Sequence, residues 1–170
     1  MHWNRPEVRR YLWDDAEVTI DSVTGTVARA LAATTDCGGG LWLMSVADEF
    51  IGTCGLLPVF PELDSLLTET LDPTLTLLVG DSAMVEVLYS LEPVAWGSGY
   101  ALEATRALLR FGHVELGMRI IFGGTDVANE RSARTLRSAG MLEVTRFDGD
   151  VGPLVYFATT SGKGRGAPER

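Results

Sequence analysis

The stretch that decides the fold covers residues 85–141 and reads VEVLYSLEPVAWGSGYALEATRALLRFGHVELGMRIIFGGTDVANERSARTLRSAGM. A mostly apolar run at 84–91 predicts a buried strand. Residues 101–116 place apolar side chains on one helical face and polar ones on the other, and Gly117 ends this helix. A short apolar strand at 119–122 and a helix at 129–139 follow. Strands and helices in alternation indicate an α/β fold.

Between the first of these strands and its helix stands the loop Trp96-Gly97-Ser98-Gly99-Tyr100-Ala101. The first N–H groups of a helix are unpaired and carry partial positive charge, which favours a phosphate group. Glycine allows the backbone to approach such a ligand closely. In most proteins a lone G-x-G is only a tight turn, and a Rossmann site needs a third glycine and an acid after the next strand, where only Asp126 stands. The loop favours a phosphate-containing ligand.

The remaining sequence predicts two helices, two hairpins and one less regular segment. The helices are expected at 6–12 and 22–34, and the hairpins pair 41–46 with 50–59 and 142–147 with 154–160. Residues 60–82, acidic and rich in leucine and threonine, are interpreted as an excursion over the surface that could form a lid beside a substrate. We expect one domain over 1–160 and a disordered tail over 161–170.

Composition restricts the function classes. The formal net charge of −9 disfavours non-specific nucleic-acid binding and suits a cationic amine, although solubility alone would also explain it. No apolar run approaches the roughly 20 residues of a membrane span. Cys37 and Cys54 form no CxxC pair and only two histidines are present, so no metal site is expected and a reducing, cytoplasmic setting fits best.

Three motifs in the same order resemble the core of the GNAT superfamily of N-acetyltransferases. The loop at 96–101 is similar to the pyrophosphate loop of that family, Asn129-Glu130-Arg131-Ser132 to its N-x-x-S motif, and Gly140-Met141 to the pair that closes the next helix. The branch it resembles most includes the ribosomal-protein N-terminal (alanine/serine) acetyltransferases. The resemblance implies a mixed, largely antiparallel sheet with one splayed parallel pair, flanked by helices. It also implies acetyl-CoA as co-substrate and an amine acceptor, either a protein N-terminus or a small molecule.

The same resemblance assigns a binding path for coenzyme A. The pantetheine arm is expected to hydrogen-bond along the 84–91 strand, and the amides of the loop to hold the pyrophosphate. The residues expected to bind the co-substrate are Leu88, Tyr89, Ser90, Leu91, Trp96, Gly97, Ser98, Gly99, Tyr100, Ala101 and Asn129.

Two side chains are expected to carry the chemistry by this resemblance. Glu86 stands about where one GNAT branch has a catalytic glutamate, and its apolar neighbours would raise its pKa toward that of a general base. Ser132 matches the serine that protonates the leaving thiolate, whereas Leu136 stands where many GNATs have a tyrosine for this task. The alternatives are a solvent-facing charge for Glu86 and a helix-start hydrogen bond for Ser132.

One departure from the family pattern concerns the start of the sheet. GNAT chains usually begin with an edge strand, whereas this chain opens on what looks like the following helix. A missing edge strand leaves backbone groups unpaired, so we expect that a second copy can pair there to form a homodimer. The departure also leaves open a non-catalytic acyl-CoA-binding or regulatory module on the same fold.

Overall fold

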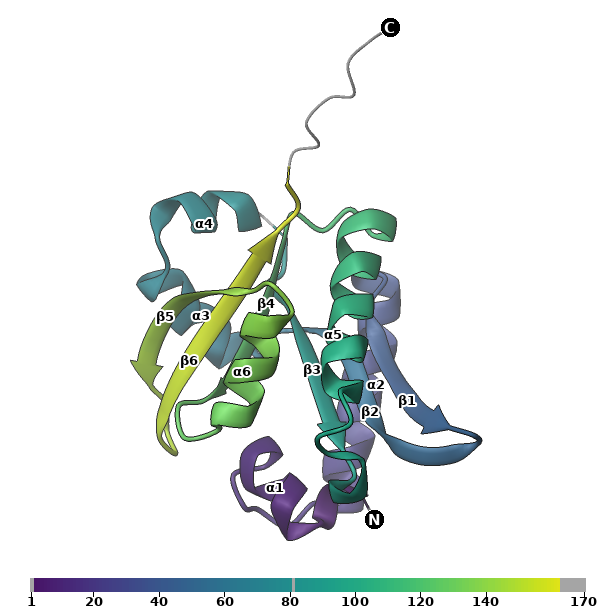
Figure 1. Cartoon of the computed structure of the whole chain (residues 1–170). Helices are drawn as coiled ribbons and strands as arrows, with labels where there is room; N and C mark the ends of the chain where they lie inside the picture. The colour runs from purple at the N-terminus through teal and green to yellow at the C-terminus, as the bar shows by residue number, and fades with distance from the viewer. Residues whose placement is uncertain (1, 81, 163–170) are drawn as a thin grey trace, which may run out of the picture.

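The centre of the protein is a mixed six-stranded sheet (Figure 1), seen in a computed structural model that describes residues 2–80 and 82–162. The strand order is β1-β2-β3-β4-β6-β5, and every neighbouring pair is antiparallel except β3 and β4. The mixed sheet with one parallel pair is therefore confirmed. The strands are β1 (Gly40–Val46), β2 (Glu49–Pro58), β3 (Val85–Leu91), β4 (Ile120–Asp126), β5 (Leu142–Asp148) and β6 (Pro153–Thr160).

Helices cover both faces of the sheet (Figure 1). On one face, α5 and α6 pack on β3, β4 and β6. On the other, α2 packs on β1 and β2, while α3 and α4 cover the half that contains β4, β5 and β6. The helices are η1 (His2–Asn4), α1 (Pro6–Leu12), α2 (Ile20–Asp36), α3 (Pro61–Thr70), α4 (Pro73–Val79), η2 (Pro93–Ala95), α5 (Tyr100–Arg110), η3 (Phe111–Glu115) and α6 (Glu130–Ser138).

The side chains of β3 divide between these two helical layers because successive residues of a strand point to opposite faces. Val85, Val87 and Tyr89 join the core under α5 and α6. Leu88 packs instead against the core formed by α2 and β2. Glu86 lies two residues before Leu88, so its side chain points to the same face of the sheet, toward α2.

The segment 60–82 differs from its expected form. It folds into α3 and α4, and Leu67 of α3, Leu71 between the two helices and Val79 of α4 are buried in the same core cluster as side chains of the sheet, so the prediction of a surface excursion and lid is wrong. Each helix begins at a proline, and the Asp72 side chain caps α4 by accepting a hydrogen bond from the Thr74 N–H at 2.8 Å. The leucines at helical spacing were the signal for burial.

Glycines account for two further differences in element length. The α-helix expected over 101–116 ends at Arg110, and the chain continues as a π-helical turn, η3. Within η3, Gly112 lies so close to β4 that a Cβ there would stand 2.5 Å from Ile121 Cδ1. The strand expected to end at 122 continues through Gly123 and Gly124 to Asp126. These glycines lower the apparent strand propensity although they fit the sheet.

Both ends of the described chain form hydrogen bonds beside the strands of the sheet. Among the described residues no strand precedes α1, so β1 forms an edge of the sheet, and its Leu43 is 77% exposed. The first residues instead pack at the end of β3, where the Trp3 indole N–H donates to Ser90 Oγ at 3.2 Å. At the other end, Ser161 still donates its N–H to the Arg119 carbonyl at 2.8 Å. Most of the tail expected to be disordered, 163–170, lies outside the described residues.

Candidate active site

The sheet opens between its two parallel strands. β3 and β4 form a single residue pair, Glu86 with Phe122, whereas the neighbouring antiparallel strands pair along most of their length. Beyond this pair both strands continue to their carboxyl ends, at Leu91 and Asp126, without further pairing between them among the described residues. The edge of β3 that faces β4 at 88–91 therefore has backbone groups available for an extended ligand.

The glycine loop stands beside this opening, at the start of α5. Gly97 and Gly99 have φ values of +77° and +87°, which side-chain-bearing residues rarely adopt. Where a Cβ would stand on either glycine, no described atom lies within 4 Å. No side chain caps α5 with a hydrogen bond, so its first N–H groups remain available to a ligand. The pyrophosphate site that the sequence predicts at this loop stays a prediction.

Trp96 connects the glycine loop with β3 and α6. Its indole N–H donates to the Leu91 carbonyl at 2.9 Å, and the Arg131 guanidinium lies 5.1 Å from the centre of its ring. One carbonyl of the edge expected to bind pantetheine is therefore already engaged by Trp96. The remaining expected contacts in this segment are those of Leu88, Tyr89 and Ser90.

A pair of hydroxyl groups connects β3 with α6. The Tyr89 and Ser132 hydroxyl oxygens are 2.8 Å apart, and the Tyr89 O–H also lies 3.3 Å from the Ser132 carbonyl. Asn129 holds the start of α6 by accepting the Ser132 N–H at 3.2 Å. Burial raises the pKa of Tyr89, so its phenol keeps its proton at neutral pH. Sequence reasoning selected Ser132 but gave the Tyr89 side chain no part in the chemistry, because its contact with Ser132 depends on how α6 packs against β3.

Glu86 lies on the other side of β3, under the α2 layer. Burial raises its pKa to about 7, and the positive charge of Arg29 in α2 opposes this rise. Burial also raises the pKa of Tyr156 in β6, and the charge of Glu86 adds to that rise. The group expected to act as general base is therefore poised to exchange a proton near neutral pH. The alternative of a solvent-facing charge does not fit this position.

A hollow on the α2 side has a volume of about 220 Å³. It lies on the face toward which Glu86 points, opposite the layer that holds Tyr89 and Ser132. The residues that line it are Trp13, Asp21, Ser22, Gly25, Thr26, Arg29 and Phe60. Sequence reasoning missed this surface. Its signal was the recurrence of Ser22, Gly25, Thr26 and Arg29 at i, i+3, i+4 and i+7, which places small and polar side chains on one stripe of a helix.

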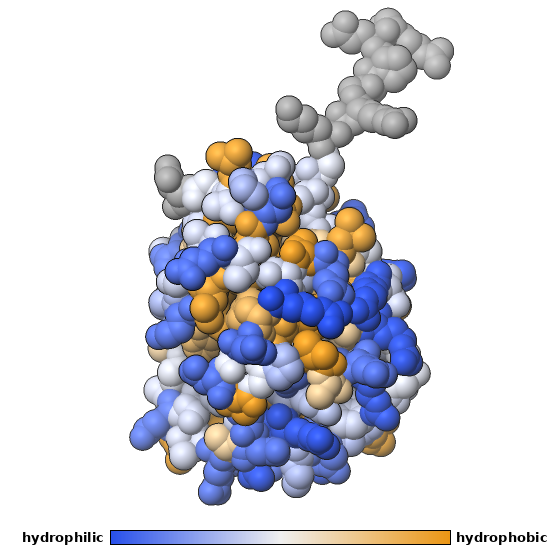
Figure 2. Space-filling model, turned by 90° about the vertical axis from the view of Figure 1, so that its left-hand side faces the viewer, coloured by the Kyte–Doolittle hydropathy of each residue, from blue (hydrophilic) through white to orange (hydrophobic). Residues whose placement is uncertain are grey.

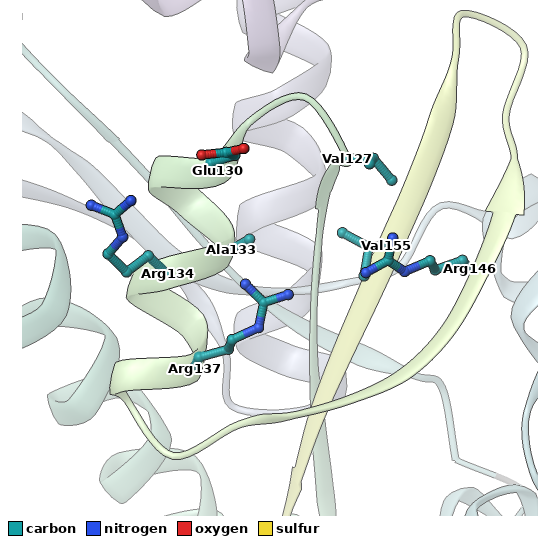
Figure 3. A pocket seen from close by; sticks show the side chains of 7 residues that line it. All are labelled: Val127, Glu130, Ala133, Arg134, Arg137, Arg146 and Val155. Carbon is teal, nitrogen blue, oxygen red and sulfur yellow. The ribbon is translucent and has the colours of Figure 1, made fainter.

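A second hollow, of about 330 Å³, lies between α6 and the β5–β6 hairpin (Figure 3). Arg134, Arg137 and Arg146 surround it. Glu143 accepts from Arg137 at 3.1 Å and from Arg146 at 2.6 Å, and so connects α6 with β5. Figure 2 shows a side of the molecule on which apolar side chains reach the surface among hydrophilic ones. Neither Glu86 nor Ser132 lines this hollow. Two of its three arginines, Arg137 and Arg146, bind Glu143 and so serve mainly to connect α6 with β5.

Two features are absent from the described residues, 2–80 and 82–162. No cluster of three or more histidine, cysteine, aspartate or glutamate side chains is arranged there to hold a metal ion. No helix in this part of the chain combines the length and apolar character needed to cross a bilayer.

Comparison with known proteins shows the family of this chain. A model of the acetyltransferase (GNAT) domain matches residues 1–142. The chain belongs to the GNAT acetyltransferase family. A curated relative, the FsC-acetyl coenzyme A-N(2)-transacetylase of Aspergillus fumigatus, is 30% identical over 115 residues, which make up 68% of this GNAT chain and 44% of the relative. The chain therefore spans less than half the length of that protein.

Solved structures show the same fold. A putative GNAT-family acetyltransferase from Bordetella pertussis superimposes with a TM-score of 0.67 at 16% identity, covering 84% of this chain and 78% of that one. AAC(6')-Ib in complex with ribostamycin and coenzyme A superimposes with a TM-score of 0.70 at 18% identity, covering 94% and 84% of the two chains. The GNAT fold is thus established independently of the sequence motifs.

Proposed function

We propose that this GNAT chain transfers an acetyl group from acetyl-CoA directly to an amine nitrogen, with Glu86 as general base. The observation that carries the proposal is a carboxylate of pKa about 7 at the last paired residue before the two parallel strands diverge. The open glycine cradle and the Tyr89–Ser132 pair stand on the opposite side of the same divergence. The amine and the co-substrate would thus approach each other from the two faces of the sheet.

The reaction removes two protons from the nitrogen and delivers one to the sulfur, and the chain supplies a group for the first removal and one for the delivery. An alkylammonium has a pKa of about 10.4, so the acceptor must lose a proton before attack, and Glu86 takes it. Bound acetyl-CoA supplies an activated thioester carbonyl. As the nitrogen–carbon bond forms and the carbon–sulfur bond breaks, the nitrogen releases its second proton to solvent and Ser132 donates a proton to the sulfur; Tyr89 reprotonates Ser132 and regains its own proton from solvent. A backbone N–H near Leu88 would stabilise the charge on the carbonyl oxygen.

The comparisons support nitrogen as the acceptor atom. The name of the fungal relative describes transfer to N(2), and AAC(6')-Ib was solved with the aminoglycoside ribostamycin. The acidic net charge of this chain is consistent with a cationic amine. The acceptor would be either a protein N-terminus, as in the ribosomal-protein branch, or a small molecule. The homodimer through the free edge of β1 stays a prediction, and a monomer mass at micromolar concentration would contradict it.

The proposal is tested by following thiol release from acetyl-CoA with a panel of primary amines between pH 5.5 and pH 9. We expect kcat/KM to rise with pH through an apparent pKa near the value of about 7 of Glu86. Glu86→Gln should lower turnover by about 10²- to 10⁴-fold, the usual worth of a general base, without changing the dissociation constant of acetyl-CoA.

The matched control is Glu115→Gln, which removes an exposed carboxylate from η3 and should leave the pH profile unchanged. Acetyl-CoA binding without turnover of any amine would contradict the proposal and indicate a non-catalytic acyl-CoA-binding module instead.

A further inference from the structure

The guanidinium of Arg29 is the least satisfied charged group on the acceptor side. Its Nε and Nη1 atoms are buried and have no hydrogen-bond partner among the described residues. Its Cζ atom lies 3.6 Å from the centre of the Phe60 ring, which holds the guanidinium flat against one wall of the α2 hollow. A buried polar atom without a partner destabilises a fold, and a ligand that pairs with it would remove that cost.

Glu86 interacts with Arg29 electrostatically but does not pair with it. Each charge influences the other, yet no ion pair within 4.0 Å joins them among the described residues. A positive and a negative group on one side of the sheet therefore interact without direct contact, and Arg29 lines the hollow whereas Glu86 does not. The rim adds a further carboxylate, Asp21, which is exposed.

We propose that Arg29 binds the carboxylate of the acceptor while Glu86 faces its amine, so that the substrates of this site are free amino acids. This inference rests on the proposed function for the amine end. Guanidinium is the side chain best suited to a carboxylate, because its N–H groups match the two oxygens in geometry and charge. The opposite orientation would set two carboxylates against each other at Glu86. A zwitterion can bind in only one direction between these two charges.

The size of the hollow agrees with an acceptor of this class. Its volume of about 220 Å³ is below the range of about 300–1,000 Å³ that is common for drug-sized ligands. The lining combines small side chains of α2 with two aromatic rings, Trp13 and Phe60, at its sides, and its surface is mostly apolar. Asp21 at the rim disfavours acceptors with a second negative group, so neutral and basic amino acids should be preferred over acidic ones.

The test compares matched acceptors: L-amino acids, each as the free acid, the carboxamide and the decarboxylated amine. For the intact protein with acetyl-CoA we expect the free acid to exceed the amine in kcat/KM by about 10- to 100-fold, the worth of a charge-assisted contact. Arg29→Gln should remove this advantage by raising KM for the acid, with little change for the amine. Phe60→Leu should weaken it less, because the guanidinium remains but is held less firmly.

Arg119→Gln is the matched control, since it removes an exposed arginine at the start of β4 and should change none of the three acceptors selectively. Calorimetric titration with the free amino acids provides a second readout. Binding that depends on Arg29 but leads to no turnover would support the inference and contradict the transfer proposal. Amines used as well as acids would overturn the inference and leave the transfer proposal intact. Carboxamides used as well as acids would also overturn it, and would indicate a peptide N-terminus as acceptor.

Discussion

The shifted pKa of Glu86 predicts a cost in stability that one substitution should remove. In the folded chain the pKa is about 7, against an ordinary value of 4.5, so the fold favours the protonated carboxyl. Below pH 4.5 the group is protonated in both states and costs nothing. As the pH rises, the unfolded chain loses the proton first, so stability falls until the folded carboxyl also ionises near pH 7, and the cost is constant above that.

Glu86→Gln removes this titration, because an amide does not ionise. Between pH 5 and pH 8 the advantage in unfolding free energy of the variant over the parent should grow by about 2–3 kcal/mol, from the two pKa values and 1.36 kcal/mol per pKa unit. Any constant effect of the amide on packing cancels in this comparison.

The assay is urea unfolding of parent and variant at several pH values, followed by circular dichroism. Glu115→Gln serves as the exposed control and should show no such trend. A stability difference that stays constant from pH 5 to pH 8 would refute the claim that burial controls Glu86.

Three further predictions concern the glycine loop, the hydroxyl pair and the close packing of β4. Ser132→Ala should lower turnover by about 10- to 100-fold and leave acetyl-CoA affinity unchanged, since it removes the 2.8 Å contact with Tyr89 but no part of the loop; an equal loss of affinity would argue for a binding role instead. Trp96→Phe should reduce the unfolding free energy by about 1 kcal/mol, because the Leu91 carbonyl loses its indole donor; an unchanged urea midpoint would contradict this. Gly124→Ala should lower the unfolding free energy by about 1–3 kcal/mol through overpacking, as its Cβ would lie 2.5 Å from the Tyr156 ring; a melting temperature equal to that of the parent would show that the ring moves aside instead.

Periodicity and turn residues were sufficient to predict most of the fold. The hairpins, the 85–91 strand and the helix after the glycine loop all appear, because each combines a clear hydrophobic pattern with glycine or proline at its ends. The prediction failed where tertiary contacts override local signals. The amphipathic α3 and α4 were mistaken for surface chain, and the glycines of β4 were taken as the end of a strand although they fit tightly against neighbouring side chains.

The candidate site divides in a similar way. The glycine loop, Glu86 and Ser132 could be selected from motifs at fixed spacing in one continuous stretch. The side chain of Tyr89 could not, because its meeting with Ser132 depends on the placement of α6 against β3. Arg29 and Phe60 are also far apart in sequence and come together only when α2 crosses the sheet. No pairwise spacing encodes such contacts.

The most direct test of the central claim is calorimetric titration of the purified protein with acetyl-CoA, in parallel with Gly99→Trp. Gly99 has positive φ and open space at its Cβ position, so an indole there would occupy the phosphate cradle. The account predicts micromolar binding to the parent chain and loss of binding in a variant that remains folded by circular dichroism. A folded parent that does not bind acetyl-CoA, or a variant that binds it equally well, would contradict the account.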